Sequence, residues 1–313
     1  MIERPDAILD NLSGLDVKVV LADIRKAGSI DSALDGCDVL FHVAANPRLW
    51  ARDKHEFWRT NAEGTRNVIA SAHSRSVPRV VYTSTESIIG PSVDGSPSNE
   101  ETPARKEDMI GRYCLSKFAA EQIALQAANN GMDIVVVNPT VPIGAGDVNR
   151  GPISYLIVEF LRGRILAYMN CALNVVDVAS VAEGHILAWK KGQRGKRYFL
   201  GDQDISVLQL LQMVSDIAGG SPPRVRIPYP VGLAFAYASE FLSNHVTGRE
   251  PCATVTGVKL TRRMSRLDCS LARRELGFEA GDLRQALTNA IVWYAARGWV
   301  PVKESRLTIR ATD

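Results

Sequence analysis

Tyr113 and Lys117 are the residues whose types and spacing most clearly suggest chemistry. They stand four positions apart in a segment, residues 108–130, whose pattern predicts a helix, so both side chains lie on one helical face. An ammonium beside a phenol favours the phenolate, which lets a tyrosine exchange protons near neutral pH. The pair therefore predicts acid/base chemistry, provided that other elements place a substrate beside it.

A second polar position follows a predicted buried strand. Residues 79–85 read as a β-branched, apolar run that ends in the hydroxyls of Ser84 and Thr85. In a parallel sheet the carboxyl ends of the strands meet at one edge, where ligands bind. We therefore expect Thr85 to share a cleft with Tyr113.

Strand and helix patterns alternate along the first two thirds of the chain. Strands are predicted at residues 17–21, 38–45, 79–85, 133–138 and 174–177, and helical segments at 29–34, 53–74, 108–130, 153–161 and 180–190, with Ser180 as the N-cap of the last. This alternation predicts an α/β fold, a doubly wound, Rossmann-like parallel sheet. His42 in the second strand is interpreted as a core histidine with a hydrogen-bond partner.

Composition excludes several classes of protein. The 313 residues carry a net charge of +3 from mixed charges spread along the chain, which singles out neither nucleic acid nor a membrane as partner. The five cysteines are scattered without a C-x-x-C pair, so we expect no metal site, no disulfide framework and a cytoplasmic location. The apolar run 231–238 is too short to span a bilayer, and we interpret it as a buried helix of a second subdomain rather than an interfacial anchor.

Several motifs occur in an order typical of one family. They include residues 49–53, 61–68, 108–111 before Tyr113, 137–144, 173–185 and 274–278. With them the chain resembles the extended short-chain dehydrogenase/reductases, the NAD-dependent epimerase/dehydratases, and within these the hopanoid-associated sugar epimerases. The resemblance implies a dinucleotide-binding part, residues 1–144 and 171–200, and a smaller substrate-binding α/β subdomain, residues 145–170 and 201–313.

The resemblance also assigns roles to single residues. Tyr113 would be the acid/base, Lys117 would bond the nicotinamide ribose and lower the pKa of the tyrosine, and Thr85 would hydrogen-bond the reacting oxygen. Cofactor contacts are implied for Asp23 and Ile24 at the adenine, Ala44 and Ala45 beneath the pyrophosphate, Asn61 as a support, and Asn138, Pro139 and Thr140 beside the nicotinamide. The cofactor would be NAD or NADP, with NAD preferred, and family habit implies a homodimer through the helices at 53–74 and 108–130.

One family motif has no counterpart in the printed chain. The family begins with a strand, a Gly-x-x-Gly-x-x-Gly turn and a helix whose backbone amides hold the pyrophosphate, whereas residues 1–10 match the end of the second strand. A start site set too late would explain this. We expect two neighbouring strands with unpaired edges, and weak NAD binding by the 313-residue form compared with an N-terminally extended form. Calorimetric titration of both forms checks this, and micromolar affinity in the short form would contradict it.

Substrate contacts are expected from Arg48, Trp50 and Glu86, the last of which we also consider as a solvent-facing residue. Arginines at 262, 263 and 266 suit a nucleotide diphosphate. The preferred function is therefore an epimerase/dehydratase-type oxidoreductase acting on a sugar or sugar nucleotide. A ketone reductase of the dihydroflavonol-reductase or hydroxysteroid-dehydrogenase kind, and a non-catalytic dinucleotide sensor or inactive paralogue, remain alternatives.

Overall fold

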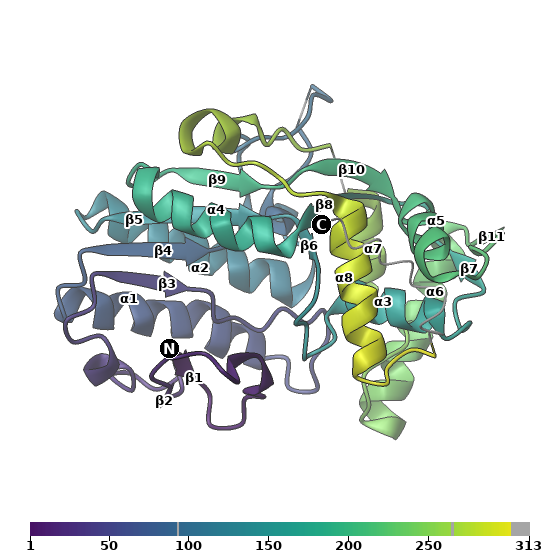
Figure 1. The fold of residues 1–313 in the computed structure, drawn as a ribbon, viewed down its shortest axis with the longest axis horizontal. Coiled ribbons are helices and arrows are strands. Elements are labelled where there is room, and N and C mark those ends of the chain that lie inside the picture. Colours follow the sequence, from purple (N-terminus) through teal and green to yellow (C-terminus); the bar gives the residue numbers. More distant parts are fainter. Residues whose placement is uncertain (93, 264–265, 302–313) are drawn as a thin grey trace.

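A four-stranded parallel sheet forms the centre of the computed structural model, which describes residues 1–92, 94–263 and 266–301 (Figure 1). Its strands lie in the order β3 (Val39–His42), β4 (Arg79–Thr83), β5 (Ile134–Pro139) and β9 (Arg197–Leu200). Every residue of β5 is buried, as expected for a strand covered on both faces. The predicted α/β fold with a parallel, Rossmann-like sheet is confirmed.

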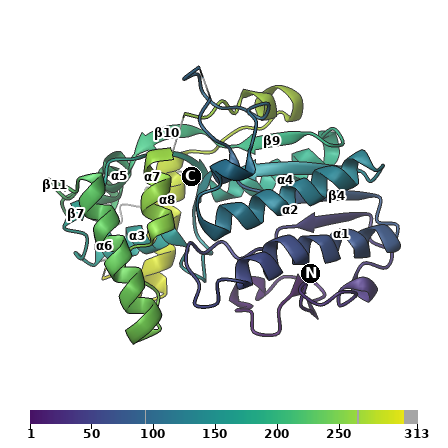
Figure 2. The same cartoon turned by 180° about the vertical axis from the view of Figure 1, so that it is seen from behind.

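Helices cover both faces of this sheet. Helices α1 (Gly64–Ser74) and α2 (Gly111–Asn129) lie on one face, in front in Figure 2, and α4 (Val178–Lys191) lies on the other, in front in Figure 1. Two clusters of buried aliphatic side chains fill the layers between the helices and the sheet. The carboxyl ends of β4 and β5 thus meet the beginning of α2.

The sheet is interrupted on the side of β3. Strands β1 (Ile2–Glu3) and β2 (Val20–Leu21) pair in parallel with each other as a separate two-stranded sheet, and β3 pairs only with β4 among the described residues. Leu21 and Val43, at the ends of strands on either side of the interruption, are both exposed. The structure therefore has the unpaired edges and exposed apolar side chains that the sequence predicts.

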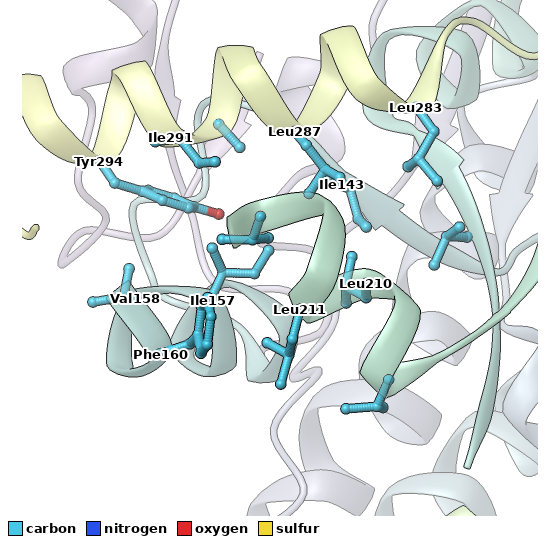
Figure 3. Close-up of a cluster of buried hydrophobic side chains, with 14 of the residues drawn as sticks. Ile143, Ile157, Val158, Phe160, Leu210, Leu211, Leu283, Leu287, Ile291 and Tyr294 are labelled. Carbon is cyan, nitrogen blue, oxygen red and sulfur yellow. The ribbon is translucent and has the colours of Figure 1, made fainter. Parts of the chain in front are cut away.

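A second, three-stranded sheet supports the C-terminal part of the chain. Its strands are β6 (Val141–Ile143), β8 (Ala172–Asp177) and β10 (Gln203–Ser206), with β8 in the centre. Helices α3 (Pro152–Leu161), α5 (Val207–Ala218) and α8 (Leu283–Ala296) pack their apolar side chains together beside it (Figure 3). Because β8 pairs on one side with β6 and on the other with β10, the two proposed parts of the chain share this sheet.

The remaining strands and helices are β7 (Ala167–Tyr168), β11 (Val225–Arg226), α6 (Tyr229–Leu242) and α7 (Val255–Arg263). Of these, β7, β11 and α6 lie at the outer end of the C-terminal part, whereas α7 lies between α6 and the start of α2. The interpretation of residues 231–238 as a buried helix is wrong, because only Gly232 and Ala236 of α6 are buried. Helix α6 packs on α7 along one side, and no described element covers its opposite side.

The start of α4 also differs from the prediction. Asp177, not Ser180, is the N-cap, since its carboxylate accepts hydrogen bonds from the Ser180 backbone N–H at 3.1 Å and from the Ser180 hydroxyl at 3.0 Å. An aspartate at the end of a strand satisfies the first amides of the helix better than a residue inside its first turn. The helix therefore begins two residues earlier than expected.

Candidate active site

Thr85 lies just beyond the carboxyl end of β4, where the chain turns into a short 3-10 segment at residues 86–88. Its hydroxyl accepts a hydrogen bond from the Ser87 backbone N–H at 3.2 Å and donates one to Glu86 Oε2 at 2.9 Å. Thr85 also lies close enough to Tyr113 for its hydroxyl to lower the pKa of the phenol. The strand end and the helix thus bring together the two hydroxyls that the sequence assigned to one cleft.

Tyr113 and Lys117 are placed by the first turns of α2. Gly111 begins this helix with φ of +72°, a conformation that favours glycine, and a Cβ at this position would lie 2.4 Å from Thr256 Oγ1 of α7. The close approach therefore holds the tyrosine against the C-terminal part of the chain. One turn later, buried Lys117 donates to the Thr83 carbonyl at 2.7 Å and to the Tyr82 hydroxyl at 3.2 Å.

Burial dominates the protonation of this pair. It raises the pKa of Tyr113 well above its ordinary value, partly offset by the hydrogen bond to Thr85, so the phenol is protonated at neutral pH. Burial lowers the pKa of Lys117 to about 8, while the nearby Glu121 carboxylate acts in the opposite direction. Since Lys117 contacts Tyr82 and Thr83 here, the lowering of the tyrosine pKa by Lys117 stays a prediction.

The depressed pKa of Lys117 predicts a pH-dependent stability. The unfolded chain holds this proton up to pH about 10.5 and the folded chain only up to about 8, so the free energy of unfolding should rise as the pH goes from 8 to 10.5. Lys117→Met removes this contribution. Urea denaturation of both proteins across this window should show wild-type stability increasing relative to the variant. A constant difference would contradict the assignment.

Two buried asparagines support the site from below. Asn61 accepts from the Asn46 backbone N–H at 2.7 Å and donates to the Asn46 carbonyl and the Ser116 hydroxyl. Asn138 donates to the Thr85 carbonyl at 3.1 Å and to Glu121 Oε2 at 2.8 Å. Asn61 therefore fixes the loop after β3 and Asn138 fixes the end of β4.

Polar groups at the carboxyl ends of β4 and β5 fit the nicotinamide end of a dinucleotide. Asn138 Oδ1 and the Ser84 hydroxyl are buried without a hydrogen-bond partner among the described residues, and both lie at strand ends beside Thr85. Buried polar atoms normally have partners, so these two atoms suit a polar ligand. Lys117 supplies a cation at the same place, while Pro139 ends β5 and Thr140 connects it to β6.

The predicted adenine and pyrophosphate contacts lie at the interrupted side of the sheet. Asp23 is half-buried and forms an ion pair with Arg25 at 2.6 Å, which lowers the pKa of its carboxyl, and the Ile24 carbonyl accepts from Asn67. Ala44 is exposed and Ala45 half-buried just past β3. Small exposed residues leave room for a pyrophosphate, but no glycine-rich turn at a helix N-terminus supplies amides there among the described residues.

A small cavity opens beside Thr85. It is lined by residues from the loop after β4, from β8 and from α7 with the segment after it: Glu86, Ser87, Ile89, Asn174, Leu260, Arg263 and Leu267. The interpretation of Glu86 as a solvent-facing side chain is wrong, since its carboxyl lines this cavity and burial raises its pKa. Nη2 of Arg263 is buried without a hydrogen-bond partner among the described residues.

The other two predicted substrate residues lie apart from these lining residues. Trp50 is buried against residues 243–247, where its indole N–H donates to Asn244 Oδ1 at 3.1 Å, and Arg48 is exposed in the loop after β3. Sequence reasoning missed Asn174, Leu260 and Leu267 as lining residues. No local signal marks them, because only the pairing of β8 and the packing of α7 bring them to Glu86.

Two further expectations concern ions and membranes. In the described part of the chain, no three His, Cys, Asp or Glu side chains are grouped to hold a metal ion. None of the helices described is both long and apolar enough to cross a bilayer.

His42 is buried and its Nε2 lies 2.9 Å from the Thr65 hydroxyl, as expected of a core histidine.

Comparison with known proteins places this site in a family. The family described as "NAD dependent epimerase/dehydratase family" matches residues 4–201. A Synechocystis protein named "Putative dihydroflavonol 4-reductase" is 40% identical over 93% of this chain and 85% of its own length. "Sterol demethylase protein B" of Methylococcus capsulatus is 30% identical over 92% of this chain and 88% of its own. A crystal structure of PA4631, a nucleoside-diphosphate-sugar epimerase from Pseudomonas aeruginosa, has a TM-score of 0.77 at 22% identity and covers 96% of this chain and 89% of that one. The chain belongs to the NAD-dependent epimerase/dehydratase family.

Proposed function

We propose that this protein is an NAD(P)-dependent oxidoreductase that reduces a ketone on an apolar, ring-containing substrate. The observation that carries the proposal is the cavity beside Thr85 and Tyr113, whose walls combine Ile89, Leu260 and Leu267 with a few polar groups. Small-molecule sites combine apolar walls with a few polar groups that orient the ligand. At about 40 Å³ this cavity would take the carbonyl end of such a substrate, with its rings outside it. Relatives named for a dihydroflavonol reductase and a sterol demethylase support a substrate with rings.

Reduction of a ketone adds a hydride at carbon and a proton at oxygen. A bound reduced nicotinamide would supply the hydride. Tyr113 would donate the proton to the carbonyl oxygen. The Thr85 hydroxyl, which donates to Glu86 Oε2 in this structure, would turn its one proton to the same oxygen when substrate binds. The raised pKa of Tyr113 suits this direction, because a protonated phenol is a proton donor. Lys117 favours the phenolate that remains after the transfer.

A sugar or sugar-nucleotide epimerase is the second candidate. Nη2 of Arg263, which is buried and has no hydrogen-bond partner within the described ranges, favours it, since a guanidinium recognises phosphate or carboxylate oxygens. An epimerase oxidises the substrate and returns the hydride to the other face of the ketone. It therefore leaves the ratio of oxidised to reduced cofactor unchanged.

One assay separates these functions from a non-catalytic one. The purified protein is incubated with NADPH or NADH and a panel of dihydroflavonols, ketosteroids and UDP-sugars, and reduced nicotinamide is followed by its absorbance. Stoichiometric oxidation with a ring ketone is the expected result. Epimerised sugar without net oxidation would favour the second candidate, and cofactor binding without any turnover would favour a dinucleotide sensor.

Glu86 offers a test of the cavity itself. Its carboxyl is hydrogen-bonded to the Thr85 hydroxyl and lines the space where the substrate would lie. We expect Glu86→Ala to lower kcat/KM by about 10- to 100-fold, the loss of a hydrogen bond worth about 1.5–3 kcal/mol. Glu86→Gln, which keeps an acceptor, should lose less. Equal kinetics for Glu86→Ala and wild type would show that the substrate does not reach this cavity.

A further inference from the structure

Helix α6 has an unusual composition for a helix at the surface. Its 14 residues contain a single charged side chain, Glu240, and this carboxylate accepts a hydrogen bond from the Val255 backbone N–H at 2.8 Å, toward α7. A helix that faces water normally carries charged residues on its outer side. The outer side of α6 carries none.

The exposed side chains of α6 form a continuous apolar surface. Val231, Phe235, Leu242 and Val246 recur on one face through α6 and the turn that continues it, and Phe241 lies about 100° further round the helix beside Leu242. We call these five residues the α6 stripe. Phe235 is 58% exposed, Phe241 65% and Val246 72%. A contiguous exposed apolar patch of this kind is typical of a surface that binds a protein partner or a membrane.

Arginines stand at both ends of the α6 stripe. Arg224 and Arg226 are exposed in and beside β11, three to five residues before α6 begins, and Arg249 follows its last turn. Arg52 reaches the same end, with Nη1 at 3.7 Å from the position of a Cβ on Gly248. None of these four forms an ion pair with any residue that the structure describes. The α6 stripe with arginines at both ends therefore matches a ligand that has an apolar layer bordered by negative charges.

We propose that the α6 stripe binds the surface of an anionic lipid bilayer, with α6 lying in the plane of the headgroup–acyl boundary. Apolar side chains enter this boundary while flanking arginines meet lipid phosphates. A second copy of the chain fits less well, because a symmetric contact through the stripe would bring like-charged arginines together. Helix α7, which packs on the other side of α6, carries Leu260 and Arg263 of the cavity, so α6 would lie between the bilayer and the substrate site.

Vesicle flotation of the full chain tests this proposal. We expect wild type to float with phosphatidylcholine/phosphatidylglycerol vesicles, and the double variant Phe235→Asp/Phe241→Asp to show a partition coefficient at least about tenfold lower. Leu21→Asp is the matched control, since Leu21 is 56% exposed on β2 at the other end of the molecule (Figure 1). Circular dichroism establishes that the variants are folded.

The charges are tested separately. Arg224→Glu/Arg226→Glu should weaken binding to anionic vesicles more than binding to pure phosphatidylcholine, whereas Arg194→Glu, an exposed arginine after α4, should leave both unchanged. The proposal is overturned if wild type does not float, or if the stripe variant floats equally well. It is also overturned if wild type sediments as a dimer, the stripe variant sediments as a monomer, and wild type does not bind vesicles.

Discussion

Tyr113→Phe should lower kcat by about 10²- to 10⁴-fold, the usual contribution of a positioned acid or base. The variant keeps the ring, which packs with Leu260 and Leu267 of the cavity wall, and removes only the hydroxyl on which Thr85 acts. Because the phenol is protonated at neutral pH, its loss removes the proton donor for the carbonyl oxygen. Steady-state rates with the best ketone from the substrate panel, under saturating reduced cofactor, measure the effect.

The control for this variant is Tyr155→Phe. Tyr155 is a partly exposed tyrosine of α3 and lies outside the cluster in which Tyr113 packs with Ile89, Leu260 and Leu267, so removing its hydroxyl should leave kcat unchanged. Cofactor affinity should be similar in wild type and both variants, which separates lost chemistry from lost binding. A Tyr113→Phe enzyme that retains more than about a third of kcat would remove Tyr113 from the proposed mechanism.

Glu121→Ala should destabilise the fold by about 3–5 kcal/mol, the cost of breaking a buried charge pair by removing one partner. Glu121 is fully buried in α2, where its carboxylate accepts from Asn138 Nδ2 at 2.8 Å and lies 3.4 Å from Arg197 Nη1 of β9. Without this carboxylate, the positive charge of Arg197 loses its ion-pair partner in a site that is mostly shielded from water. Chemical denaturation at neutral pH measures the change.

Two matched variants separate charge from packing at this position. Glu121→Gln keeps an acceptor for Asn138 but loses the charge, so it should fall between wild type and Glu121→Ala. Asp53→Ala breaks an ion pair with Arg59 in which both side chains are about half exposed, and should cost much less than Glu121→Ala. If Glu121→Ala cost no more than Asp53→Ala, the buried network would not stabilise the end of β5.

The same network connects stability to the site. Asn138 holds the Thr85 carbonyl with the amide that also reaches Glu121, and Glu121 acts on the protonation of Lys117 one turn earlier in α2. A change at Glu121 should therefore also reduce activity, although this carboxylate is not among the groups that line the cavity.

The local elements, and the placement of Tyr113 and Lys117 on one helix, follow from the residues in sequence order. Strands such as β4 and β5 are buried on both faces, so continuous apolar runs identify them, and helix α2 places Tyr113 and Lys117 on one face because its period is fixed by backbone hydrogen bonding. Ordered family motifs then placed Thr85 beside them.

Which side chains are buried, and what they contact, depends on how the elements pack together. Residues 231–238 are apolar in any context, but whether such a helix is buried depends on which elements pack around it, and here only α7 does so closely. Glu86 faces a cavity because α7 and β8, distant in sequence, form its other walls. Burial and partner choice arise from contacts between segments far apart in the chain, which neither periodicity nor spacing encodes locally.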